Sequence, residues 1–206
     1  EAEYCCRFPT DAKASAFNAK DWKACSAGAG MPPRPDRPGI GYDVEPDGSA
    51  AALAAAWRDA DGQAHIELLA FDPGTDWLPN RARAAALKHR AQPAFDSIGA
   101  NHDPAQVLAR LRVRTAPIQL RFMQAATARF AREVANHNLR HYEQPDLNDA
   151  IDGAAWRHVG EGGRLLGRKA SANSVAPVVA GIAALWQFDQ VAKRPGAAGA
   201  SFTAGS

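Results

Sequence analysis

Three apolar runs between residues 39 and 72 constrain the fold more than any other part of the sequence. The runs cover residues 40–44, 50–57 and 65–71. They are separated by Glu45-Pro46-Asp47-Gly48 and by Arg58-Asp59-Ala60-Asp61-Gly62. Both separators are rich in residues that favour turn dihedral angles. Runs of this length joined by such turns predict a meander of three antiparallel strands.

One acidic residue lies inside the first of these strands. Asp43 is flanked by Tyr42 and Val44 in an otherwise apolar segment. A buried carboxylate is costly unless a cation or strong hydrogen-bond donors accompany it. Asp43 is therefore a candidate functional residue. The alternative is an aspartate at the end of a strand that caps the following turn.

Helices alternate with short strands after the meander. Patterns and turn residues indicate helices at residues 79–90 and 103–111 and strands at 93–99 and 112–118. This alternation places the later strands parallel to the first, beside the meander. The prediction is an α/β fold with a mixed five-stranded sheet, consisting of a three-stranded antiparallel meander and two parallel strands, flanked by helices. Further helices are expected at residues 119–137, from 144 onward, and at 175–190.

Asp96 is a second acid in an apolar strand. If its strand is the parallel neighbour of the strand of Asp43, both carboxylates lie near the carboxyl ends of adjacent central strands. Two carboxylates this close repel each other unless a cation lies between them. Mg²⁺ and Mn²⁺ take oxygen ligands of this kind, so the pair predicts a divalent metal site. The alternative is that Asp96 only begins a loop.

The domain organisation follows from length and from proline and glycine content. A chain of 206 residues with 46% hydrophobic residues is expected to form one globular domain with a sizeable core. Residues 26–38 contain four prolines and two glycines, which indicates a linker. We therefore expect residues 1–38 to be the tail of a preceding region plus this linker, residues 39–192 to be the domain, and residues 193–206 to be a disordered tail.

Composition gives weaker guidance about compartment and partners. No run is long or apolar enough to span a bilayer, and the N-terminus does not resemble a signal peptide, so a cytosolic protein without a membrane partner is expected. Cys5, Cys6 and Cys25 show no metal-binding spacing, which favours reduced thiols. The net charge of +2 gives no global reason to expect nucleic-acid binding, so a DNA-binding role requires a local basic face.

A basic, glycine-rich segment at residues 160–169 is the best local candidate for phosphate contact. It lacks the Gly-Lys-Ser/Thr of a phosphate-binding loop and is better described as a basic hairpin that contacts a phosphate backbone. Arg164, Arg168 and Lys169 are its candidate DNA-binding residues, with Arg140 added from a polar loop that also contains His137 and His141. The alternative is a group of solvated surface charges.

A series of short motifs occurs along the chain in a distinctive order. They are Trp22-Lys23-Ala24-Cys25, the proline-rich linker, Gly41-Tyr42-Asp43-Val44-Glu45-Pro46-Asp47-Gly48, Gly74-Thr75-Asp76-Trp77, Phe95-Asp96, His141-Tyr142-Glu143-Gln144-Pro145-Asp146-Leu147, Ala176-Pro177-Val178-Val179-Ala180 and Ala183-Ala184-Leu185-Trp186. Their order and spacing over nearly all of residues 15–190 resemble the C-terminal nuclease domain of large terminase subunits from tailed phages, particularly those of actinobacterial hosts.

The resemblance implies a ribonuclease H-like fold and an endonuclease that cuts concatemeric double-stranded viral DNA during packaging. It also implies an N-terminal ATPase domain in the same polypeptide, with the portal and the small terminase subunit as partners. The implied location is the cytoplasm of the infected bacterial host, docked on the procapsid.

The sequence departs from the family at the third acid. The family usually supplies it just before the proline that opens the last helix, where this chain has Asn173 and Ser174. An amide or hydroxyl can still ligate a metal, but it brings no charge. The metal site is then weakened, or it recruits Asp149 or Asp152 from the preceding helix. The alternative for these two aspartates is that they are solvated residues in the first turn of that helix.

These observations lead to a two-metal hydrolysis hypothesis. Two Mg²⁺ or Mn²⁺ ions about 4 Å apart would be held by Asp43, bridging both, and by Asp96. Two alternatives remain open at this point. One is a catalytically weakened DNA-clamping module, which the missing third acid favours. The other is an actin-like phosphotransferase, which requires a glycine- and threonine-rich phosphate turn and a second lobe that the sequence does not indicate.

Overall fold

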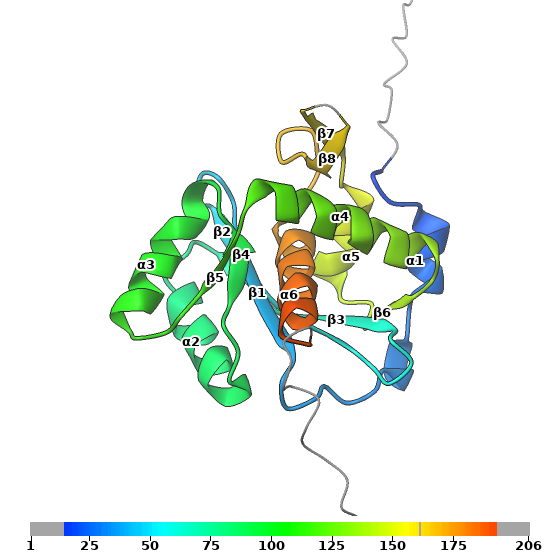
Figure 1. Ribbon diagram of the computed structural model, residues 1–206. Helices are drawn as coiled ribbons and strands as arrows, with labels where there is room; N and C mark the ends of the chain where they lie inside the picture. The colour runs from blue at the N-terminus through cyan, green and yellow to red at the C-terminus, as the bar shows by residue number, and fades with distance from the viewer. Residues whose placement is uncertain (1–14, 161, 193–206) are drawn as a thin grey trace, which may run out of the picture.

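A computed structural model describes residues 15–160 and 162–192, and its central feature is a six-stranded mixed sheet (Figure 1). The strands are β1 Gly39–Val44, β2 Ala50–Arg58, β3 Ala64–Pro73, β4 Ala94–Asp96, β5 Ala116–Ile118 and β6 Leu139–His141, in the spatial order β5-β4-β1-β2-β3-β6. The α-helices are α1 Ala19–Ala24, α2 Leu78–His89, α3 His102–Arg110, α4 Leu120–Ala135, α5 Pro145–Asp152 and α6 Ala176–Ala192. Two short 3-10 helices, η1 Gly28–Gly30 and η2 Gly99–Asn101, and a separate hairpin of β7 Trp156–Val159 and β8 Gly163–Leu166 complete the described part.

The strand pairing confirms the meander and the parallel strands predicted from the sequence. β1 pairs antiparallel with β2 and β2 with β3, whereas β4 runs parallel to β1 and β5 runs parallel to β4. The expected count of five strands is one too low, because β6 adds a parallel strand beside β3. The sequence indicates a polar loop there. The three residues of β6 form a strand because of their tertiary pairing with β3, which no local pattern reveals.

Residues 15–25 pack into the same core as the sheet. Phe17, Trp22 and Cys25 are buried there. The Trp22 indole stacks on the His141 ring, with 3.9 Å between the ring centroids. The sequence indicates a segment separated from the domain by a linker, whereas the structure joins it to β6. Trp22 and His141 are 119 positions apart, so local composition does not reveal their contact.

The last helix, α6, packs directly on β1 because two glycines allow the backbones to meet (Figure 1). A methyl group added to Gly41 would lie 2.3 Å from the backbone oxygen of Ala180 and 2.3 Å from the backbone nitrogen of Ala184. Gly39 faces Ala184 and Phe188 in the same way. The strand therefore needs glycine wherever the helix crosses it. The order of these contacts shows that α6 runs antiparallel to β1, so α6 begins near the carboxyl end of that strand.

Side chains of β1 alternate between two core layers, as in any strand. Ile40, Tyr42 and Val44 point into one layer, which also contains residues of α2 and α3. The intervening residues, Asp43 among them, point to the face that α6 covers, with α4 and α5 beside it (Figure 1). The alternation therefore places the carboxylate of Asp43 close to the beginning of α6.

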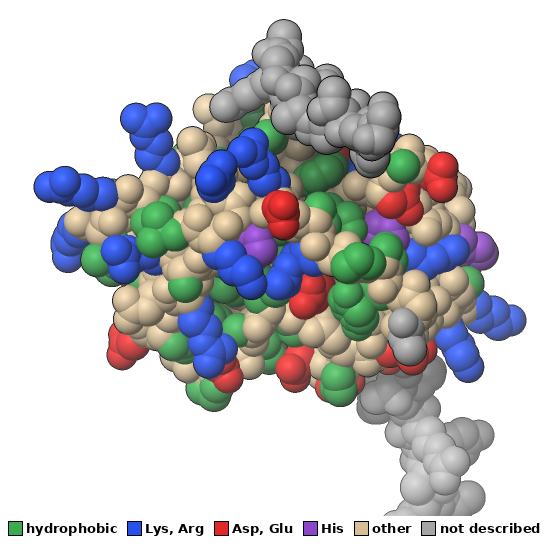
Figure 2. All heavy atoms as spheres, turned by 90° about the horizontal axis from the view of Figure 1, so that it is seen from below, with side chains coloured by type: hydrophobic (Ala, Val, Ile, Leu, Met, Phe, Trp, Pro, Cys, Tyr) green, Lys and Arg blue, Asp and Glu red, His purple; other side chains and the backbone are tan. Residues whose placement is uncertain are grey.

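The surface charge, the helices and the cysteines bear on the predictions made from composition. Figure 2 shows the face seen from below, where Lys and Arg side chains are mixed with acidic and hydrophobic ones instead of forming one continuous basic surface. No helix in the described ranges has the length and apolar character needed to cross a bilayer. Cys25 is a free, buried thiol, whereas Cys5, Cys6 and the tail expected at residues 193–206 lie outside the described residues.

Candidate active site

Asp43 and Asp96 come together at the carboxyl ends of two neighbouring parallel strands. The pairing of Gly41 with Ala94 sets the register of β1 and β4, and each aspartate lies two residues further along its strand. Asp43 is fully buried and Asp96 is partly buried. The predicted adjacency of the two strands is thus confirmed. The joint role of the two carboxylates stays a prediction.

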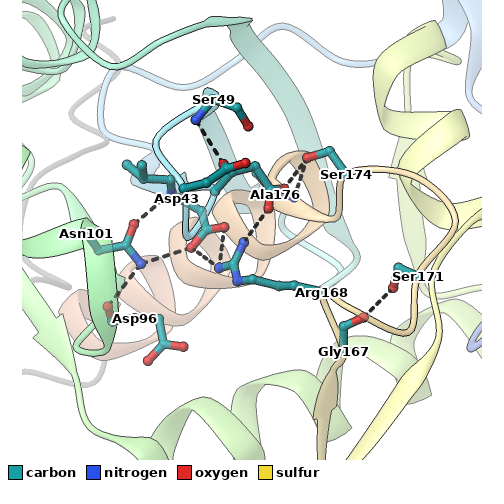
Figure 3. A network of polar contacts seen from close by, with 12 residues as sticks. Asp43, Ser49, Asp96, Asn101, Gly167, Arg168, Ser171, Ser174 and Ala176 are labelled. Atoms are coloured by element: carbon teal, nitrogen blue, oxygen red, sulfur yellow. Dashed lines mark hydrogen bonds and ion pairs between the residues drawn. The ribbon is translucent and has the colours of Figure 1, made fainter.

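Asn101 fastens β1 to β4 at this point (Figure 3). Its Nδ2 donates hydrogen bonds to Oδ1 of Asp43 at 3.0 Å and to the backbone oxygen of Asp96 at 3.1 Å. Its Oδ1 accepts a hydrogen bond from the backbone nitrogen of Val44 at 2.8 Å. Asn101 is buried at the end of η2. The sequence analysis missed this residue, because most of its partners belong to a strand more than fifty residues away.

Arg168 provides a positive charge in direct contact with the acids (Figure 3). Its Nη2 donates to Oδ1 and Oδ2 of Asp43 at 2.7 and 2.6 Å, and its Nη1 lies 3.6 Å from Oε2 of Glu45. The basic hairpin expected at residues 160–169 is present as β7 and β8, and Arg168 lies in the turn that follows it. The sequence assigns Arg168 to DNA binding, whereas in the structure it forms an ion pair with Asp43.

Burial and this ion pair act on Asp43 in opposite directions. Burial raises the pKa of Asp43 to about 6, while the guanidinium of Arg168 and the amide of Asn101 favour the carboxylate and limit the rise. Burial also raises the pKa of Asp96, opposed by the charges of Arg168 and Arg157. The short distances from Nη2 of Arg168 to Asp43 are those of a charge-assisted hydrogen bond, so the two side chains form an ion pair.

Glu45 is a third acid of the site that the sequence analysis missed. Its carboxylate accepts a hydrogen bond from the hydroxyl of Ser174 and lies beside Arg168. Residues two apart on a strand share a face, so the spacing from Asp43 to Glu45 could have revealed it. Glu45 was assigned from the sequence to the turn with Pro46, Asp47 and Gly48, so its spacing from Asp43 was not considered.

The structure separates the four residues considered for the third ligand. Ser174 is joined to the acids through Glu45. Asn173 is exposed, and its side-chain amide donates to the backbone oxygen of Asp149 at 2.8 Å. Asp149 and Asp152 are exposed on α5. Across residues 15–160 and 162–192, no three His, Cys, Asp or Glu side chains form a metal-binding cluster, so neither of these aspartates completes one.

The remaining basic residues divide between two places. Arg164 on β8 is exposed, and its guanidinium lies 4.5 Å from the centroid of the Trp156 ring across the hairpin. Lys169 follows Arg168 and is exposed. Arg140 lies on β6, an edge strand separated from β1 by β2 and β3, where it donates to nearby backbone oxygens. The structure therefore brings Arg164 and Lys169 to the hairpin side of the acids but leaves Arg140 away from them.

A cavity of about 400 Å³ opens beside the acids. Its walls come from the loop after β4, from α4 and from the hairpin, and they include Asp96, Ile98, Met123, Trp156, Leu166 and Arg168. The walls are mainly apolar, with Arg157 and Lys169 also contributing positive charge. The acids therefore adjoin a space in which a substrate group can lie against both apolar and cationic side chains.

The oxygen atoms at this site suit a hard divalent cation. Asp43, Asp96 and Glu45 offer carboxylates and Ser174 offers a hydroxyl, which are the ligand types that Mg²⁺ and Mn²⁺ prefer. Among the described residues, buried Oδ1 of Asp96 has no hydrogen-bond partner. Buried acceptors are rarely left unpaired, so this atom has unused capacity for a cation. The chemistry of these residues thus fits a divalent metal, which Asp43 and Asp96 would hold.

The mixed sheet and its flanking helices match the ribonuclease H-like fold of terminase nuclease structures, which confirms the expected fold class. The solved structures that this chain resembles include phage large terminases and their nuclease domains. The chain is similar to the HK97 bacteriophage large terminase, with 14% identity, a TM-score of 0.68, and coverage of 82% of this chain and 43% of that one. It therefore spans less than half of the HK97 protein.

Two metal-bound structures of the large terminase nuclease from thermophilic phage G20c are also similar. The magnesium-bound structure has 16% identity and a TM-score of 0.56, covering 76% of this chain and 83% of that one. The cobalt-bound structure has 14% identity and a TM-score of 0.60, covering 87% and 98%. No family model and no curated protein sequence matches the chain. At these identities the likeness establishes the fold.

Proposed function

We propose that this chain is the nuclease domain of a phage large terminase and that it cuts concatemeric double-stranded viral DNA with the help of Mg²⁺ or Mn²⁺, two ions in the full site. The observation that carries the proposal is the placement of Asp43 and Asp96 at the carboxyl ends of adjacent parallel strands in a ribonuclease H-like fold. The bound magnesium and cobalt in similar nucleases support the use of a divalent metal.

The residues of the chain divide the work of phosphodiester hydrolysis. Asp43 and Asp96 would hold the metal, which when bound activates water and stabilises the leaving oxygen. Asn101 fixes the relative position of the two acids through its hydrogen bonds to both strands. Arg164 and Lys169 would hold the DNA backbone by charge and leave its sequence unread.

The wider assignments belong to the same proposal. The chain would follow an N-terminal ATPase domain in one polypeptide and act with the portal and the small terminase subunit. Its place of action would be the cytoplasm of the infected bacterial host, on the procapsid during packaging. The support is the similarity to large terminase structures, of which the chain spans a part.

A DNA-clamping module with weak catalysis is the second candidate function. Asn173 and Ser174 stand where a third acid is expected, and the described residues contain no group of three His, Cys, Asp or Glu that could hold a metal. A hydroxyl offers a metal an oxygen without a charge, which lowers affinity for the cation. If this loss is decisive, the domain binds DNA without cutting it.

Replacing Ser174 with aspartate is expected to raise Mn²⁺-dependent plasmid nicking by roughly tenfold or more, since a direct ligand should be worth at least as much as the roughly tenfold that an outer partner contributes. The reason is that Ser174 already contacts Glu45 within the acid network. Asn173→Asp is the matched control, because Asn173 is exposed and bonded to α5. Equal activity of wild type and both variants would show that the third ligand lies elsewhere.

The DNA path is tested by salt dependence. Each phosphate contact that is lost should flatten the slope of log affinity against log salt by about one unit, so Arg164→Ala with Lys169→Ala should flatten it by about two. The matched control is Arg83→Ala with Lys88→Ala, two exposed cations on α2. Duplex binding and plasmid cleavage in Mn²⁺ are measured in parallel. Binding with cleavage supports the nuclease, binding without cleavage supports the clamp, and equal slopes for all proteins remove Arg164 and Lys169 from the path.

A further inference from the structure

The guanidinium of Arg168 forms hydrogen bonds with both carboxylate oxygens of Asp43, the most deeply buried acid of the site. One nitrogen, Nη2, lies 2.7 and 2.6 Å from the two oxygens of Asp43, which has no exposed surface. The other nitrogen, Nη1, is buried without a hydrogen-bond partner and faces Glu45 at 3.6 Å. A single guanidinium thus offsets part of the negative charge of Asp43, Glu45 and Asp96, and it contacts Asp43 directly (Figure 3).

The backbone aims this arginine at the acids. Gly167 accepts hydrogen bonds from the backbone nitrogens of Ala170 and Ser171 at 3.0 and 2.9 Å, which closes the turn that carries Arg168. Gly167 also donates to the backbone oxygen of Ala155 at 2.8 Å, and Ser171 Oγ accepts from Ala155 at 2.9 Å. These hydrogen bonds fix the turn to the base of the hairpin. The backbone therefore holds Arg168 in a position from which its side chain reaches Asp43.

Arg168 also borders a cavity that could accommodate its side chain in another conformation. It lines the cavity of about 400 Å³ next to the acids, together with the cations Arg157 and Lys169. Because Arg168 already lines this space, a change of side-chain rotamer would move the guanidinium from Asp43 into it while the turn stays in place. A phosphate in the cavity would meet the guanidinium there, because arginine binds phosphate oxygens through paired hydrogen bonds.

We propose that Arg168 is the resident counterion of the acid site, that it must leave Asp43 before a divalent cation can bind there, and that its released guanidinium binds a phosphodiester of the DNA. This inference rests on the proposed nuclease function. The guanidinium already bonds both oxygens of Asp43, and its positive charge repels an incoming cation, so we expect metal binding at Asp43 to displace it. Arg168 thereby holds the acids together without metal and lowers their affinity for it.

Direct measurement of Mn²⁺ binding tests the proposal without DNA and without activity. Calorimetric titration of the full chain should give a roughly 10- to 100-fold tighter Mn²⁺ affinity for Arg168→Gln than for wild type, because a charge-assisted pair no longer has to be broken. Arg168→Lys should lie between the two. Arg110→Gln, which removes an exposed charge from α3, should match wild type. In EDTA, Arg168→Gln should melt at a lower temperature than wild type, and Mn²⁺ should raise its melting temperature more.

The outcomes separate this inference from the proposed function. Equal or weaker Mn²⁺ binding by Arg168→Gln, with binding in wild type that Asp43→Asn abolishes, overturns the role of Arg168 and leaves the nuclease intact. Binding that survives Asp43→Asn, or no binding by any variant, overturns the metal site itself. If Arg168→Gln does not fold, the guanidinium nitrogen signals of Arg168 in the wild type are followed by NMR. Saturating Mg²⁺ should release their hindered rotation, and unchanged signals contradict the proposal.

Discussion

Asp43→Asn is expected to reduce Mn²⁺-dependent plasmid nicking by at least about 100-fold, a loss comparable to removing a principal electrostatic stabiliser from an active site. The substitution keeps the size of the side chain but removes its charge and replaces one acceptor oxygen with a donating NH2 group. That charge lies fully buried beside Asp96, where it would attract a cation most strongly. Supercoiled plasmid is incubated with the protein in Mn²⁺, and nicked and linear products are quantified.

The control for this experiment is Asp61→Asn. Asp61 is an exposed residue in the turn between β2 and β3, so its substitution removes the same charge without touching the site. Circular dichroism of Asp43→Asn is needed as well, because the change leaves Arg168 without its partner. A folded Asp43→Asn protein that nicks plasmid as fast as wild type would rule out Asp43 as a metal ligand.

Gly41→Ala is expected to lower the free energy of unfolding by about 3 kcal/mol or more, at or above the upper end of the usual cost of overpacking. The new methyl group would lie 2.3 Å from two backbone atoms of α6, and backbone atoms cannot rotate away as a side chain can. Either α6 shifts off β1 or the protein does not fold. Urea denaturation followed by circular dichroism measures the change.

Gly30→Ala is the matched control, because no atom lies within 4 Å of the added methyl group and the backbone there is compatible with alanine. Its free energy of unfolding should stay within about 0.5 kcal/mol of wild type. A Gly41→Ala protein as stable as this control would show that α6 does not pack on β1 as described.

The sheet was largely predictable because its central strands carry a local signal. Residues 40–44, 50–57 and 65–71 are apolar runs bounded by turn residues, a pattern typical of strands. The short strand β6 was not predictable, since its three residues are ordered by β3 and by the Trp22 indole. Contacts between distant residues leave no periodic pattern in the sequence.

The candidate site divides in the same way. Asp43 and Asp96 were predictable, because an acid inside an apolar strand conflicts with its surroundings. The contacts of Asn101 and Arg168 with Asp43 were not, since these residues lie 58 and 125 positions from Asp43 and are brought to it only by tertiary packing. Glu45 lies between these cases. Its spacing from Asp43 was visible, and its place in a turn motif concealed it.

The antiparallel packing of α6 on β1 has a consequence for synthesis on the ribosome. α6 is the last helix of the described residues, yet it lies against the central strand and covers one face of the sheet (Figure 1). Until residues 176–192 have left the exit tunnel, the glycine face of β1 and the buried alanines of β2 lack the helix that covers them in the folded protein. These strands are therefore open to misassociation while the residues between them and α6 are being synthesised, and the core layer beneath the helix closes only when α6 arrives.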